Sequence, residues 1–341
     1  LIGRGGVDLA TGQAFQGQMT APGGAAVISP LTTLVQQMMA NQPGKSQASV
    51  EDDIFRALDI PRVDLSSFDP IQAGLDTTST RDTQLVAAKV QAVTSQLVNV
   101  ITVSSAVTTK LAPGNTNGNQ GAVTALATAI QQAASSGTSV NLSNPATVAS
   151  VVKTTAQNAG VVNEDSTSEL LDSVERWSDQ AGKSLEGINT KTQQAVEALS
   201  NNADSNITDA LSDVFKLQTL TQTKVVESIE VANAGDLQEV VDRFNGQSLD
   251  TEVENIQAGN LNTETPTNEG NVTRPNTPPP APAVSLELDS GDQNDDLLTN
   301  SATINVGNLD ADSSWEFSLD GGSSWNAGSG SSFVIAESGS Y

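Results

Sequence analysis

The chain has 341 residues and carries 40 acidic against 15 basic side chains, which gives a formal net charge of −25 at pH 7. So large a negative charge excludes nucleic acid and anionic membrane surfaces as expected partners and favours cations as ligands. The sequence contains no Cys and no His, so disulfides, imidazole metal sites and catalytic triads that need His or Cys are excluded within it.

The apolar content is modest: 37% of the residues are hydrophobic and 3% are aromatic, so we expect a core of Ala, Val, Leu and Ile. No apolar run approaches the roughly 20 residues that cross a bilayer, so we expect no membrane insertion. We also expect no signal peptide. Because the sequence begins at Leu1 and ends at Tyr341 inside a predicted strand, it is expected to be a segment of a longer protein.

Residues 1–29 have the composition of short strands and turns. Gly and Pro cluster around two strand candidates, residues 14–20 and 25–28. This part is therefore predicted to be a short β segment, the end of a preceding β module.

Capping residues directly before proline mark the starts of three predicted helices: Ser29-Pro30, Asp69-Pro70 and Asn144-Pro145. The capping side chain accepts hydrogen bonds from free backbone N–H groups. Proline at the first helical position loses no hydrogen bond, because an N–H there would have no partner within the helix. A fourth helix is expected to start where Ser49 and Asp52 have the spacing of a capping box. The predicted helices cover residues 31–40, 47–58, 70–75 and 146–159.

Apolar residues recur at alternating spacings of three and four over three long stretches, residues 80–111, 166–200 and 204–231. This heptad-like pattern predicts long amphipathic helices, and Leu237 to Phe244 carry one more. We expect residues 30–258 to form an elongated antiparallel helical bundle, with reversals at loops such as 113–118.

Whether the helix continues across Asn201-Asn202 distinguishes two architectures. A continuous helix would indicate a true coiled coil. The Asn pair, followed by Asp204 as a new cap, favours a break and therefore the bundle.

The C-terminal part changes character. Residues 259–282 are polar and rich in proline, which predicts a linker. Residues 283–341 show alternating apolar and polar positions at 284–288, 302–306, 315–319 and 332–335, with a tight turn at Asp320-Gly321-Gly322. The predicted fold class is therefore mainly α: a short β segment, the helical bundle, and an incomplete immunoglobulin-like (Ig-like) β-sandwich.

The last 55 residues or so resemble the bacterial Ig-like repeats of giant repetitive surface adhesins, which Gram-negative bacteria export by type I secretion and which often end in RTX calcium repeats. The resemblance rests on residues 286–291, 295–300 and 315–325. Residues 6–35, together with Asp64-Leu65 and Asp69-Pro70, resemble a segment of the same proteins that joins a small β module to a helical domain. The resemblance implies an extracellular location, at the bacterial cell surface or secreted.

An acidic turn over residues 289–296 is the best candidate for a metal site. Its carboxylates suit Ca²⁺, which takes six to eight oxygen ligands, although the spacing is not that of an EF-hand. The alternative interpretation is a solvated acidic loop, because turns favour Asp and Asn. The candidate Ca²⁺ ligands are Asp289, Asp292, Asp295 and Asp296.

Other polar and aromatic groups have structural alternatives. Trp315 and Trp325 flank the predicted turn, either as a sugar-stacking platform or, more typically, as core residues. Trp177 falls on a heptad position, which indicates packing. Acid pairs at 51–53 and 164–165 stand at helix starts, where negative charge is favourable. No catalytic or cofactor-binding residues are predicted beyond the Ca²⁺ candidates.

Together these features predict a non-enzymatic structural protein that acts as a spacer and extension segment of a large adhesin or surface fibre. Its expected partners are neighbouring modules of the same chain, a second copy in a homo-oligomer, and cell-surface or matrix components. One alternative is a filament or sheath subunit that polymerises through its helices. Another is a carbohydrate- or peptide-binding module.

Overall fold

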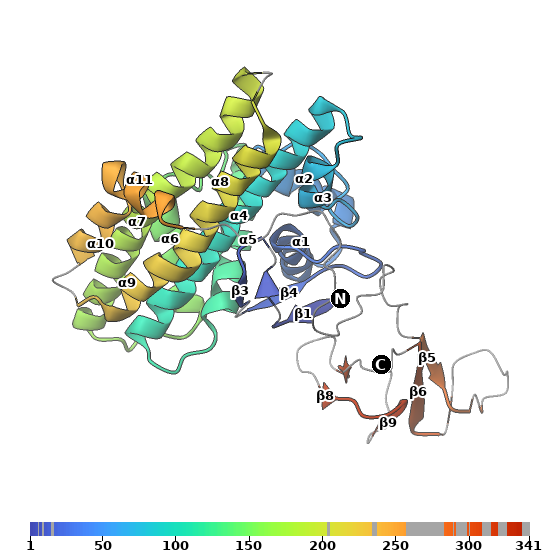
Figure 1. The fold of residues 1–341 in the computed structure, drawn as a ribbon. Helices are drawn as coiled ribbons and strands as arrows, with labels where there is room; N and C mark the ends of the chain where they lie inside the picture. The colour runs from blue at the N-terminus through green and yellow to red at the C-terminus, as the bar shows by residue number, and fades with distance from the viewer. Residues whose placement is uncertain are drawn as a thin grey trace. The chain divides into compact units, whose positions relative to one another are not determined.

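The computed structural model describes residues 1–256 except 6, 9, 15, 16, 203, 204 and 234–236, and, further along, residues 283–288, 290, 299, 301–308, 315–319 and 326–335. The chain divides into two compact units, Leu1–Thr265 and Pro266–Tyr341 (Figure 1). The first unit is helical with small sheets at its start, and the second contains small sheets. The boundary lies within the segment predicted to be a linker, residues 259–282, which falls outside the described residues.

Two small antiparallel ladders form the N-terminal β segment. Strand β1 (Ile2–Arg4) pairs with β4 (Gln18–Thr20), and β2 (Val7–Asp8) pairs with β3 (Gln13–Ala14). The strand predicted at 25–28 is wrong. There the backbone N–H groups of Ala26 and Val27 both donate to the carbonyl of Ser66, so the segment is attached to a loop and not to a sheet.

The predicted helices of the first unit occur in the predicted order, and each predicted cap-and-proline start is confirmed. Helices α5 and α11 were not predicted individually. Ser29, Asp69 and Asn144 accept hydrogen bonds from backbone N–H groups of the first helical turn. The predicted cap at Ser49 is wrong, because Ser46 caps that helix instead. The helices are α1 (Pro30–Asn41), α2 (Gln47–Leu58), α3 (Pro70–Leu75), α4 (Arg81–Leu111), α5 (Gly118–Ser136), α6 (Pro145–Asn158), α7 (Ser168–Asn201), α8 (Ile207–Leu220), the π-helical turn η1 (Thr221–Val225), α9 (Val226–Val231), α10 (Leu237–Arg243) and α11 (Gly246–Glu254).

Helix α4 lies at the centre of the unit and packs against α1, α3, α5, α6, α7, α8 and α9. The predicted heptad positions Val90, Leu97 and Val100 are buried, but so are the polar Ser95 and Asn99 on other faces. The helix is therefore surrounded, and its apolar positions do not form a seam to a single partner. It is also long and apolar enough to cross a membrane by length and composition alone, but 72% of its most apolar window is buried inside the unit, so the expectation of no membrane insertion stays a prediction.

The break after α7 is real. Helix α7 ends at Asn201, and α8 begins at Ile207 behind Asn206, whose side chain accepts from the N–H of Thr208. The continuous-helix alternative is therefore wrong. From α8 the chain runs through η1 into α9 without a break, so the predicted helix over 204–231 contains a π-helical turn that the periodicity did not indicate.

Several helices approach one another closely at glycines. A Cβ atom at Gly182 of α7 would lie 2.2 Å from the carbonyl oxygen of Pro145 in α6. At Gly121 of α5 it would lie 3.0 Å from the carbonyl oxygen of Thr155. These contacts bring backbones together, which explains how a chain with few aromatic residues still builds a dense helical core.

A buried polar chain attaches the β segment to the helices. The Gln218 side-chain N–H donates to Asp8 Oδ2 at 2.8 Å, and the hydroxyl of Ser95 donates to Gln218 Oε1 at 2.7 Å. Asp8 belongs to β2, Gln218 to α8 and Ser95 to α4. The β segment therefore belongs to the same compact unit as the helices.

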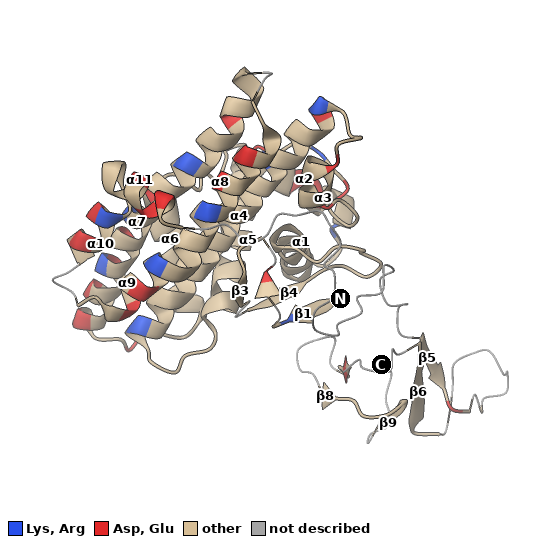
Figure 2. Cartoon of the chain, in the orientation of Figure 1, with Lys and Arg blue, Asp and Glu red and all other residues tan. Residues whose placement is uncertain are grey.

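Charge is unevenly distributed over the helices. Helices α1 and α5 carry no charged residue, whereas Figure 2 shows blue and red positions along α7, α8, α9 and α10. Uncharged helices suit positions that are covered by neighbours, and α1 and α5 pack against each other.

The second unit contains a three-stranded antiparallel sheet of β5 (Ala283–Leu286), β6 (Thr303–Gly307) and β9 (Ser332–Val334), in the order β5-β6-β9. A separate ladder pairs β7 (Glu316–Phe317) with β8 (Asn326–Ala327). Each of the four predicted strand regions thus contributes a strand. Within the described residues these sheets remain small and do not make up an Ig-like sandwich.

Candidate functional site

The predicted calcium site cannot be placed. Asp289, Asp292, Asp295 and Asp296 all lie outside the described residues. In the part of the chain that is described, no group of three or more acidic side chains is arranged to hold a metal ion. Calcium binding at the acidic turn therefore stays a prediction.

Trp315 has the contacts of a packed aromatic residue. Its ring centroid lies 6.1 Å from that of Phe317 and 6.0 Å from that of Phe333, and those two phenylalanines stack at 3.9 Å. Its indole N–H donates to the carbonyl of Gly330 at 2.9 Å. A Cβ at Gly328 would lie 2.3 Å from the indole ring, so this glycine packs directly against it. Trp325 is outside the described residues.

The remaining residues singled out in the sequence have structural surroundings. Trp177 is buried on α7, with the ammonium of Lys110 5.7 Å from its ring centroid. Asp53 is buried in α2 and forms ion pairs with Lys45 and Arg56. Asp52 pairs with Arg62. The first turn of α2 contains no acidic residue, so the role predicted for the acids at 51–53, at a helix start, is wrong. Asp52 and Asp53 lie further along the helix and pair with neighbouring cations instead.

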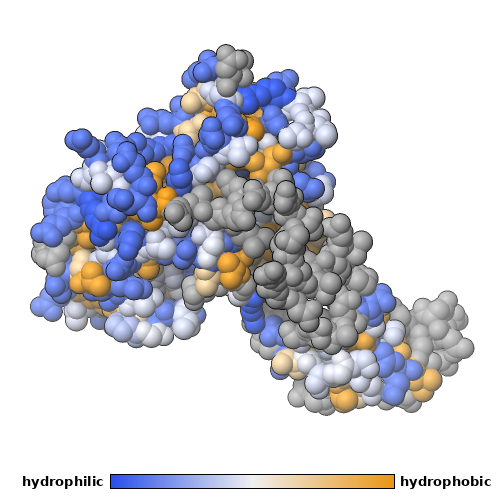
Figure 3. All heavy atoms as spheres, in the orientation of Figure 1, coloured by the Kyte–Doolittle hydropathy of each residue, from blue (hydrophilic) through white to orange (hydrophobic). Residues whose placement is uncertain are grey.

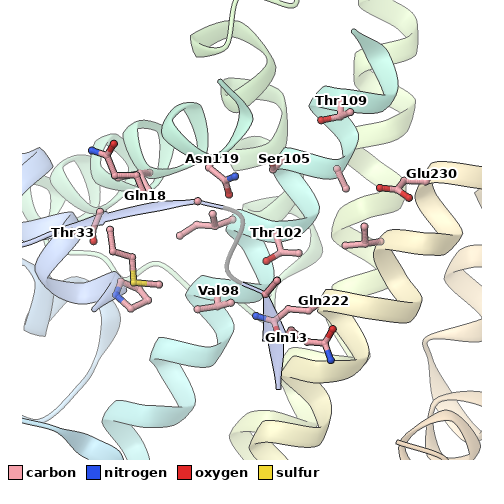
Figure 4. A pocket seen from close by; sticks show the side chains of 18 residues that line it. Gln13, Gln18, Thr33, Val98, Thr102, Ser105, Thr109, Asn119, Gln222 and Glu230 are labelled. Atoms are coloured by element: carbon pink, nitrogen blue, oxygen red, sulfur yellow. The ribbon is translucent and has the colours of Figure 1, made fainter. Parts of the chain in front are cut away.

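A pocket of 490 Å³ lies between the β segment and the helices (Figure 4). Strands β3 and β4 contribute one side, α4 and α5 contribute others, and η1 with α9 completes the wall. Its polar lining is made of hydroxyl and amide side chains, and Glu230 is the one charged residue that lines it among those described. Apolar side chains such as Val98, Ile101 and Val226 fill the space between them.

One face of α4 presents three hydroxyl groups to this pocket, those of Thr102, Ser105 and Thr109. Their spacing of three and four places them on one stripe of the helix. Elsewhere on α4, Thr94 and Thr108 donate to the backbone carbonyl four residues earlier, each at 2.8 Å. Among the described residues the three pocket hydroxyls make no such bond, so their hydrogen-bonding capacity is available to the pocket.

Gln222 reaches the pocket from the π-helical turn. Its Oε1 is buried and has no hydrogen-bond partner in the described part of the chain. Around it, the hydroxyls of Thr219, Thr221 and Thr223 donate to carbonyls four residues earlier. Such bonds compete for helix carbonyls and bend helices, which is a physical reason for the π-turn at this place. Gln222, Val226 and Glu230 follow at spacings of four and line the pocket together.

Glu230 stands at the exposed rim. The ammonium of Lys110 donates to its backbone carbonyl at 2.7 Å, which joins the ends of α4 and α9 beside the opening. Figure 4 shows Thr109 and Glu230 toward one end of the pocket and Gln13 with Gln222 toward the other. The arrangement supplies a hydroxyl and a carboxylate at one end and amide groups at the other, with apolar side chains also in the lining.

This pocket was not predicted from the sequence. A signal was present in the run Thr219 to Thr223, where three threonines within five helical residues weaken regular helix geometry.

Comparison with known proteins adds no assignment: no family model, no curated protein and no solved structure matches the chain.

Proposed function

We propose that this chain is a non-enzymatic, extracellular structural segment, a spacer and extension piece of a large modular bacterial surface adhesin. Two lines support the proposal: the resemblance of residues 286–325 to adhesin Ig-like repeats, and the way in which the helical unit is anchored at its N-terminal end. A spacer in a chain of modules carries tension from one neighbour to the next. The segment at which tension enters, here the N-terminal β segment, must therefore be bonded to the helices.

The observation that carries the proposal is the hydrogen-bonded attachment of the β segment. The carbonyl of Thr20 accepts from the hydroxyls of Thr32 and Thr33, each at 3.1 Å, and the N–H of Thr20 donates to Thr33 Oγ1 at 2.9 Å. With the Asp8–Gln218 bond, strands β2 and β4 are each tied to a helix. In Figure 1, β1 and α11 lie on opposite sides of the helical unit, so tension would cross it.

The finer architecture belongs to the same proposal. We infer that the helices form an elongated antiparallel bundle and that the second unit begins an Ig-like sandwich. Stacking of Phe317 in β7 against Phe333 in β9 supports a two-sheet arrangement. Ca²⁺ at Asp289, Asp292, Asp295 and Asp296 would stiffen the start of that module, and calorimetry with millimolar Ca²⁺ tests it: absence of heat would argue against the site.

Single-molecule force spectroscopy on the whole chain, pulled through its two ends, tests the spacer role. The helical unit should open in one cooperative event that releases about 80–90 nm, since 256 residues extend by about 3.3–3.6 Å each. Gradual lengthening at low force, with no such event, would contradict the proposal.

The exposed surface of the described helices gives little support to the alternative of a filament subunit. The large apolar side chains that are exposed on the described helices are Leu171 and Val231, which do not form a stripe. Figure 3 shows a mostly hydrophilic visible face on this unit, with scattered hydrophobic residues. Light scattering after size-exclusion chromatography, with Ca²⁺ and with chelator, should give a monomer at all concentrations. Concentration-dependent assembly would favour the filament.

A further inference from the structure

We propose that the pocket between β3, β4, α4, α5 and α9 binds a small, neutral, polyhydroxylated molecule of the mono- or disaccharide class. This inference is independent of the spacer role, because it rests on the pocket alone. The pocket's 490 Å³ falls within the range of about 300–1,000 Å³ that is typical of small-molecule sites.

Gln222 carries a buried side-chain oxygen without a hydrogen-bond partner among the described residues. A buried acceptor without a hydrogen bond is costly, and such groups in folded proteins call for a specific explanation. Gln222 Oε1 is buried, has no partner among the described residues, and belongs to a side chain that lines the pocket. A ligand that donates a hydrogen bond to this oxygen would satisfy it. π-helical turns, such as the one that carries Gln222, also occur frequently at functional sites.

The second step is the complementarity of the other polar groups. The hydroxyls of Thr102, Ser105 and Thr109 can each donate and accept, which matches a ligand whose own groups do both. Glu230 at the rim accepts only. A molecule with several hydroxyl groups meets all of these requirements at once, whereas a purely accepting ligand would leave Gln222 Oε1 unsatisfied.

The third step is charge. No Lys or Arg is among the described residues that line the pocket, and the chain as a whole carries −25, so phosphorylated and carboxylated ligands are disfavoured. Val98, Ile101 and Val226 offer apolar surface to the C–H groups of a sugar ring. Neutral saccharides combine such apolar faces with hydroxyl edges.

The test uses the whole chain with glucose, galactose, N-acetylglucosamine and lactose as probes, followed by saturation-transfer NMR and calorimetry. At least one probe should bind saturably at millimolar concentration or below. Glucuronic acid and glucose 6-phosphate serve as anionic comparisons and should bind at least tenfold more weakly.

Two variants localise the binding. Gln222→Met removes the amide at similar size, and Thr102→Val removes one hydroxyl at similar shape. Each variant should lower the affinity for the saccharide at least tenfold, which corresponds to about 1.4 kcal/mol of binding free energy. Because Gln222 Oε1 is unsatisfied without ligand, Gln222→Met should keep or raise the melting temperature, so lost binding cannot be attributed to lost folding.

Thr128→Val on α5 is the matched control, because Thr128 is a partly exposed helical threonine that does not line the pocket. It should leave binding unchanged. Binding that survives both pocket variants would overturn the proposal. A preference for the anionic probes, or binding of peptides in place of saccharides, would also overturn it. The absence of binding of every neutral probe at about 10 mM would do the same.

Discussion

At the residue scale, two buried helical glycines differ in what a Cβ atom would meet, and this shows which of them the packing requires. A Cβ at Gly182 meets the backbone carbonyl oxygen of Pro145, 2.2 Å away, which cannot move without shifting α6. A Cβ at Gly74 meets the tip of the flexible Leu211 side chain at 3.0 Å. The first position is required by the helix crossing, while the second can relax.

Gly182→Ala should therefore lower the free energy of unfolding by about 1–3 kcal/mol, because overpacking outweighs the gain in helix propensity of about 1 kcal/mol. Gly74→Ala is the matched comparison and should stay within about 1 kcal/mol of the unmodified chain. Urea denaturation of both variants measures the difference. Equal stability of the two would contradict the assigned role of the α6–α7 contact.

Asp76, after α3, titrates below its ordinary carboxyl value of 3.8. The pKa of Asp76 is lowered first by the hydroxyl of Thr78, then by the backbone N–H of Thr78, with a smaller contribution from Ser79. The hydroxyl of Thr78 donates to Asp76 Oδ1 at 2.7 Å. Because the folded pKa is depressed, the stabilisation is present above pH 3.8 and is lost as the pH falls through the lower folded value.

NMR titration of Asp76 should give a midpoint below 3.8, and Thr78→Val should raise that midpoint. Thr77→Val, one residue away on the exposed loop, is the control and should leave it unchanged. A midpoint that does not respond to Thr78→Val would assign the shift to another cause.

At the scale of elements, the sequence predicted those features that depend on neighbouring residues. Ser29-Pro30 and Asn144-Pro145 begin helices through contacts within one turn, so their positions follow from local chemistry. Helix α5 was not predicted, and its first residue, Gly118, was assigned to the loop over residues 113–118. In the structure a Cβ at Gly118 would lie 2.8 Å from the Cα of Ser105, so the glycine serves packing between helices.

The pocket could not be predicted for a related reason. Its lining comes from strands, the first helix, the central helix and the π-helical turn, which lie far apart in sequence. The relevant property of Gln222, an unpartnered buried oxygen, exists only once these elements are assembled. Periodicity describes which face of one helix is buried, but not which faces of several helices leave space between them.

The attachment of the β segment to the helices is an element-scale property with a direct test. Gln218→Leu removes the partner of both Asp8 and Ser95 in a buried setting, at a cost of about 1–3 kcal/mol. Backbone amides of β1 to β4 should then exchange with deuterium at least fivefold faster, while α7 is unaffected. Gln193→Leu, at an exposed position of α7, is the control. Unchanged exchange in the β segment would show that its attachment depends on Thr32 and Thr33 instead.

At the scale of the whole molecule, 40 acidic against 15 basic side chains make self-repulsion a dominant electrostatic contribution. The ion pairs among the described residues, such as Lys153–Glu175 and Lys216–Asp213, are mostly exposed and each contribute little. Salt screens both the repulsion and the ion pairs. Because the repulsive interactions among the excess carboxylates outnumber the ion pairs, salt should relieve more repulsion than attraction.

The melting temperature should therefore rise as NaCl increases from 20 to about 500 mM, because the Debye length falls from well over 10 Å to a few ångströms. KCl at equal ionic strength is the control for a screening effect and should act identically. CaCl₂ at equal ionic strength separates screening from binding: an additional rise, abolished by replacing Asp289, Asp292, Asp295 and Asp296 with Asn, would indicate the acidic turn. A melting temperature that falls with NaCl would mean that the local ion pairs outweigh the net charge, and that the excess of carboxylates is tolerated through their distance from one another.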